Sequence, residues 1–73
     1  PVTTVAFNLA EQGNVNVSVY NIKGQKVSEL TNDFYEAGQH QLIWNAEGKA
    51  SGVYFVRMHT NGTTQNQKII LMK

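Results

Sequence analysis

The chain of 73 residues has no cysteine, a single proline and few charged side chains. Without cysteine it can form neither a disulfide nor a thiolate metal site. Charged residues make up 15% of the chain, the formal net charge is +1, and the basic residues are scattered. A nucleic-acid-binding surface needs clustered lysine and arginine, so no nucleic-acid partner is expected. No apolar run approaches the roughly 20 residues of a membrane-spanning helix, and no membrane insertion is expected.

The length predicts one domain over residues 1–73, close to the lower size limit at which a hydrophobic core alone stabilises a fold. The abrupt start at Pro1-Val2 predicts that this domain belongs to a longer protein. Period-two alternation of apolar and polar residues is clear along the chain. No helical pattern reaches 10–12 residues, so an all-β fold is expected.

Residues 51–60 and 63–73 predict a β-hairpin around Asn61-Gly62, because this dipeptide supplies the positive φ angles of a type I′ turn. A two-residue loop places Tyr54 opposite Ile69, and a longer turn would move every side chain to the other face. With the shorter loop, the core face carries Tyr54, Val56, Met58, Ile69 and Leu71. The opposite face carries Val53, Phe55, Arg57, Lys68 and Ile70.

Residues 2–9, 15–19 and 39–45 alternate in the same way and predict three further strands. Residues 21–24 have the composition of a type I turn, with Gly24 in the left-handed region closing a hairpin through a bulge. The returning strand covers residues 25–30.

Val27 and Leu30 anchor this returning strand, and their spacing of three predicts that it is short or bulged. Residues 31–33 are expected to form a loop. Phe34-Tyr35 would add a short edge segment.

Short, evenly spaced strands with polar turns predict a small antiparallel immunoglobulin-like β-sandwich of six to seven strands. A meandering barrel is the alternative. Trp44 is the largest apolar side chain and is expected in the core beside Tyr54. The predicted core comprises Phe7, Val17, Val19, Leu42, Trp44, Tyr54, Val56 and Ile69.

The polar residues do not predict an enzyme, and no catalytic, cofactor-binding or metal-binding residue is expected. The carboxylates are Glu11, Glu29, Asp33, Glu36 and Glu47, most of them in turns or at strand ends. His40 and His59 lie on different strands without neighbours at metal-ligand spacing. Exposed aromatic residues could bind sugar or peptide, and the candidates are Tyr20, Phe34 and Tyr35. For Tyr20 a core or cross-strand position is favoured. Phe34, Tyr35 and the polar faces support an alternative function, an accessory immunoglobulin-like carbohydrate- or protein-binding module of an extracellular enzyme.

An ordered set of short motifs resembles the C-terminal sorting domain of proteins exported by the type IX secretion system of Bacteroidetes-type bacteria. These motifs are TTVAFNL from Thr3, VSVYNIKGQKV from Val17, AGQH from Ala37, WN at Trp44, SGVYFVRM from Ser51 and QKIILMK from Gln67. The resemblance covers nearly the whole chain. It implies a non-enzymatic signal domain at the C-terminus of a larger secreted protein.

The resemblance also implies partners and a route. Such a domain directs its cargo from the periplasm across the outer membrane, through translocon and shuttle proteins. A surface sortase-like protease then cleaves the domain and attaches the cargo to the cell surface, or the cargo is secreted. The family motifs place translocon recognition on Gly52, Tyr54, Lys68, Ile69, Ile70, Leu71 and Lys73.

The terminal hairpin offers a physical basis for recognition, because an exposed strand edge can be extended by a strand of a partner. The same edge would also allow two copies of the domain to dimerise. The alternative is that the hairpin is only structural and that the charge of Lys68 protects its edge from pairing.

Overall fold

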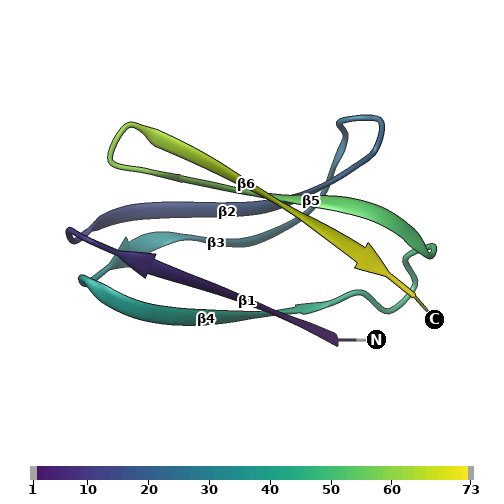
Figure 1. The fold of residues 1–73 in the computed structure, drawn as a ribbon, viewed down its shortest axis with the longest axis horizontal. Coiled ribbons are helices and arrows are strands. Elements are labelled where there is room, and N and C mark those ends of the chain that lie inside the picture. Colours follow the sequence, from purple (N-terminus) through teal and green to yellow (C-terminus); the bar gives the residue numbers. More distant parts are fainter. Residues whose placement is uncertain (1, 73) are drawn as a thin grey trace.

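The computed structural model describes residues 2–72 and consists of strands in two separate antiparallel sheets, without a helix in this range. The smaller sheet pairs β1 (Val2–Leu9) with β4 (Gly38–Asn45). The larger sheet has the order β3-β2-β5-β6 and comprises β2 (Gly13–Asn21), β3 (Lys26–Tyr35), β5 (Gly52–Thr60) and β6 (Thr63–Leu71). Two stacked sheets confirm the predicted β-sandwich and exclude the single barrel (Figure 1). A membrane-spanning helix is not found among residues 2–72.

The core lies between the sheets and follows the alternation of the sequence. Trp44 on β4 is 1% exposed, and its ring meets Tyr54 on β5 edge-to-face with centroids 5.2 Å apart, as predicted. The buried side chains include five of the residues expected there: Val17, Val19, Trp44, Tyr54 and Val56. The partly buried Phe7, Leu42 and Ile69 pack against them. Met58 and Leu71, which the predicted hairpin register placed on the core face, are buried as well. The core also holds residues that were not predicted there, namely Val5, Leu9, Val15 and Ala46.

Strand β3 corrects one expectation. Residues 31–33 are not a loop, because β3 continues through them to Tyr35 and pairs with β2, for example Thr31 with Val17 and Asn32 with Asn16. Phe34 and Tyr35 are therefore the end of β3 rather than a seventh strand. Threonine, asparagine and aspartate favour turns locally, but pairing with a complete neighbouring strand satisfies their backbone groups and overrides that preference.

The predicted bulge is confirmed on the same strand. The pairing of β2 with β3 shifts twice, and the residues passed over are Leu30 and Val27. Both side chains pack against the core. The bulges thus explain why two apolar residues three positions apart point to the same face of the strand. The turn before β3 also forms as predicted, since Gly24 has a φ of +81° and donates its N–H to the Asn21 carbonyl oxygen at 3.0 Å.

The terminal hairpin has the register expected from its two-residue turn. Asn61 and Gly62 adopt φ angles of +50° and +77°, and Tyr54 lies opposite Ile69. The Asn61 side chain reaches the neighbouring turn, where its Nδ2 donates to the Glu11 carbonyl oxygen at 3.4 Å. The tips of two connections that are distant in sequence are thus joined at one end of the sandwich.

Candidate functional site

The residues assigned to translocon recognition lie on both faces of the terminal hairpin. Tyr54 and Leu71 point into the sandwich and are 7% and 3% exposed, and Ile69 is half-buried on the same side. Lys68 and Ile70 point outward and are exposed. Lys73 lies outside the described residues. Adjacent residues of the motif therefore differ in accessibility, because successive side chains of a strand point to opposite faces.

Gly52 has a conformational role at the start of β5. Its φ of +152° lies in a region that L-residues rarely adopt, and it is exposed opposite Leu71. A Cβ at this position would meet no neighbouring atom, so the backbone angle rather than space favours glycine.

Tyr54 anchors the loop that precedes β5. Its hydroxyl donates to the carbonyl oxygen of Ala50 at 2.6 Å, while its ring packs on Trp44. A tyrosine that bonds the backbone a few residues upstream is a known corner device of immunoglobulin-like sandwiches. These structural contacts account for a tyrosine at this position without any contact to a partner protein.

The outward face of the hairpin carries an exposed patch that we call the hairpin patch, formed by Val53, Phe55, Lys68 and Ile70. Val53 lies opposite Ile70, and Phe55 lies opposite Lys68. Ile70 is 62% exposed and Phe55 is 38% exposed. Since β6 is the last strand of its sheet, this patch lies beside a row of backbone groups at a free edge.

A hollow of about 330 Å³ adjoins the hairpin patch on the same outer face. It lies between β5 and the turn that joins β2 to β3, which rises above the larger sheet at the upper right of Figure 1. The Arg57 guanidinium carbon lies 4.7 Å from the centre of the Tyr20 ring, and Arg57 Nε donates to Asn66 Oδ1 at 3.4 Å. The lining of this cavity, which we call the outer hollow, also includes Asn21, Ile22, Gly24 and Phe55.

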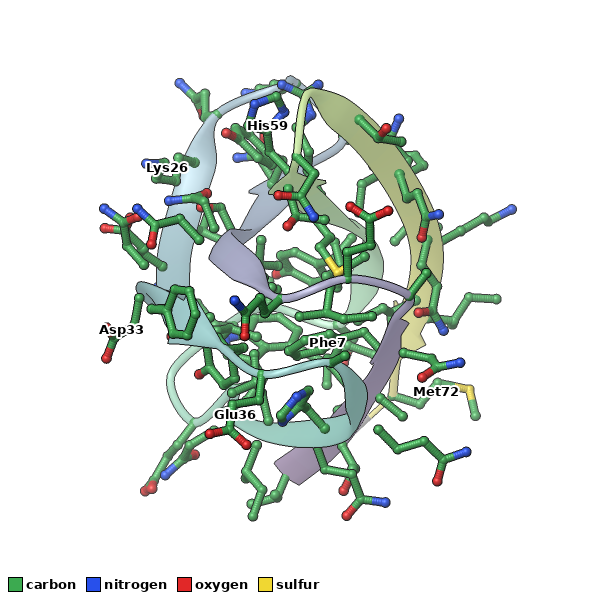
Figure 2. The ribbon with its side chains drawn as sticks, turned by 90° about the vertical axis from the view of Figure 1, so that its left-hand side faces the viewer. Phe7, Lys26, Asp33, Glu36, His59 and Met72 are labelled. Atoms are coloured by element: carbon green, nitrogen blue, oxygen red, sulfur yellow. The ribbon has the colours of Figure 1, made fainter. Side chains whose placement is uncertain are left out.

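A groove of about 440 Å³ opens on the inner side of β6, between this strand and β1. Its lining includes the buried Val17, Val56 and Met58 together with residues 65–67 of β6. Figure 2 shows β6 curling down that side of the sandwich toward β1. The inner face of β6 accordingly changes from apolar at Ile69 to amide-bearing at residues 65 and 67.

The histidines and carboxylates are dispersed. His40 Nε2 lies 2.7 Å from the Glu36 carbonyl oxygen, and its ring stacks on Phe7. His59 lies on the outer face, where its Nδ1 is 2.8 Å from Thr64 Oγ1 (Figure 2). Across residues 2–72, no three histidine, cysteine or carboxylate side chains come together as metal ligands would.

The aromatic residues considered for ligand binding have three different environments. Tyr20 lies beneath Arg57, and Phe34 is 53% exposed at the end of β3. Tyr35 packs edge-to-face on Phe7 and shares a 2.8 Å hydrogen bond with Thr31. They do not form one binding platform.

Sequence reasoning missed the outer hollow and the contribution of Arg57. The contact of Arg57 with Tyr20 depends on the pairing of β5 with β2, which are separated by two other strands in sequence. The sequence feature that could have indicated this site is the alternation of β5, which places Phe55 and Arg57 on the same outward face.

No curated protein and no solved structure matches the chain. The family described as the secretion system C-terminal sorting domain matches residues 1–72. This match covers essentially the whole sequence and agrees with the resemblance of its ordered motifs. The chain therefore belongs to the family of type IX secretion C-terminal sorting domains.

Proposed function

We propose that this domain directs a cargo protein across the outer membrane and that the machinery recognises it through β6. The observation that supports this is the position of Lys68 and Ile70, which are exposed on a strand with a free edge. An extended segment of a translocon or shuttle protein would pair with that edge through backbone hydrogen bonds. Lys68 and Ile70 would then supply the side-chain contacts.

Later steps belong to the same proposal. The cargo passes through the periplasm, and a surface sortase-like protease removes the domain and attaches the cargo to the cell surface. The domain itself contributes no catalytic group. Its proposed role is to present a folded, recognisable strand.

The test is export of a periplasmic reporter fused to residues 1–73 in a bacterium with a type IX system. We expect the wild-type fusion at the surface or in the medium, and we expect Ile70→Thr to reduce export. Ile43→Thr is the matched control, because Ile43 is 68% exposed on the outer face of the other sheet while Ile70 is 62% exposed. Both variants remove similar apolar surface.

Equal export of these two variants would contradict recognition through β6. Retention of the folded wild-type fusion in the periplasm would contradict the sorting function itself. Lys68→Gln, with Lys49→Gln in the loop before β5 as its control, tests the second outward residue in the same assay.

A further inference from the structure

We propose that the outer hollow binds a carboxylate side chain from an acidic, partly apolar segment of a partner protein. Arg57 would hold the carboxylate, while Phe55 and Ile22 would contact an apolar neighbour of the acidic residue. The assignment of this partner to the export machinery rests on the proposed function. The chemistry of the hollow does not, because it follows from the residues that line it.

The guanidinium of Arg57 is held in place before any ligand arrives. Its Cζ lies 4.7 Å from the Tyr20 ring centre, and its Nε donates to Asn66 Oδ1 at 3.4 Å. A guanidinium has five N–H donors, of which this bond uses one. The terminal N–H groups form the fork that matches a carboxylate, and stacking on an aromatic ring reduces the entropy lost when a ligand binds.

Charge on the outer face favours an anionic partner. Lys68 pairs with Phe55, Lys26 pairs with Tyr20, and the exposed Lys23 lies in the turn beside the hollow. The carboxylate on this part of the sheet is Glu29, whose Oε1 accepts a hydrogen bond from Asn16 Nδ2 at 2.8 Å. Although the whole chain is nearly neutral, this face would attract an acidic segment and orient it.

Exposed apolar side chains surround the cation. Ile22 is 72% exposed on the turn, and Phe55 is 38% exposed beside Arg57. Arginine and aromatic residues are enriched at protein interfaces, where they provide most of the binding energy. The hairpin patch continues this surface toward β6, so a segment that occupies the outer hollow would also reach Ile70.

Arg57 has a structural contact that the test must separate from binding. It lies opposite Ser18, which is 1% exposed, so the arginine side chain helps to cover this residue. Arg57→Lys retains the aliphatic stem and the positive charge but removes the fork. Arg57→Gln removes the charge. Both variants should keep the wild-type melting temperature within a few degrees, which thermal unfolding would verify before binding is measured.

The first experiment uses two synthetic peptides, acetyl-SFEIES-amide and its glutamine isostere acetyl-SFQIQS-amide, titrated into isotopically labelled domain and followed by NMR. We expect the acidic peptide to bind about tenfold tighter, because charge-assisted hydrogen bonds are the stronger kind. The shifted amides should lie at residues 20–24, 55–57 and 66. Arg57→Gln should lose most of the preference for the acidic peptide, since only the attraction of the surrounding lysines remains. Arg57→Lys should bind the acidic peptide less tightly than wild type, and Lys49→Gln should change neither affinity.

Equal binding of the two peptides by the wild-type domain would overturn the proposal. So would shifts confined to the groove between β1 and β6, or an Arg57→Gln domain whose preference for the acidic peptide is as large as that of the wild type. The export assay gives a separate readout. If the wild-type fusion is exported and Arg57→Gln is exported equally well, the hollow has no part in sorting and the inference fails while the sorting function stands. If the wild-type fusion is not exported, the sorting function fails and the peptide titration alone decides the chemistry of the hollow.

Discussion

The two faces of the terminal hairpin use the same pair of strands for different purposes. The inner face carries Tyr54, Val56 and Met58, all buried, and it ends in Leu71. The outer face carries Phe55, Arg57 and Ile70, all exposed. One face stabilises the sandwich and the other is free to contact a partner.

The comparison teaches that a sequence motif is not one functional unit. A run such as Ile69-Ile70-Leu71 would be lost together in a deletion, although its side chains point alternately inward and outward. Loss of export after such a deletion could follow from unfolding or from loss of a contact surface. Single substitutions on opposite faces separate these causes.

Trp44→Ala should give the largest loss of stability among such tests. Trp44 is 1% exposed, and truncation of a buried tryptophan costs about 3–5 kcal/mol. That is most of the stability expected of a small domain. Urea unfolding of the purified domain measures the effect, and Ile43→Ala is the control, because the adjacent exposed side chain should change stability by less than about 0.5 kcal/mol. If Trp44→Ala unfolded at the same urea concentration as the wild-type domain, the position of the core would be contradicted.

Leu71→Ala and Ile70→Ala compare the two faces on adjacent residues. Leu71 is 3% exposed, and its truncation should lower the free energy of unfolding by about 2–3 kcal/mol. Ile70 is 62% exposed, so its truncation should leave stability nearly unchanged and reduce export instead. Denaturation and the reporter assay on both variants give the comparison. Similar losses of stability in the two variants would contradict the division of the hairpin into a stabilising inner face and an outer face that contacts a partner.

Tyr54→Phe should give the smallest effect. The ring and its contact with Trp44 remain, but the Ala50 carbonyl oxygen loses its 2.6 Å hydrogen bond. We expect a cost of about 1 kcal/mol and normal export of the folded domain. Amide hydrogen exchange in the loop of residues 46–51 should rise more than exchange in β2. A selective export defect with unchanged stability would instead assign Tyr54 a contact with the machinery.

Local signals predicted much of the fold. The Asn61-Gly62 turn set the register of the hairpin, and the alternation of β5 and β6 identified the inward residues. The spacing of Val27 and Leu30 predicted the bulged character of β3. Each of these signals depends on residues close in sequence, whose geometry is restricted by steric and turn preferences.

Features that depend on distant pairing were not predicted. The strand character of residues 31–33 comes from β2, whose backbone groups override a local preference for turns. The outer hollow requires β5 to lie beside β2 and the turn after β2 to rise beside it. No local signal fixes which strands become neighbours, because strands distant in sequence can pair in several orders.

The Asn61-Gly62 turn is also a site of slow chemical modification. Asparagine followed by glycine is prone to deamidation, since the unhindered glycine nitrogen can attack the side-chain carbonyl carbon and expel ammonia through a cyclic imide. Hydrolysis of that imide leaves aspartate, or an isoaspartate whose backbone is longer by one methylene. The amide that donates to the Glu11 carbonyl oxygen would be lost in either case. Asn61, which sets the hairpin register, is thus also the residue at which we expect this domain to deamidate on storage. Stored samples should accumulate a more acidic form that is altered at this end of the sandwich.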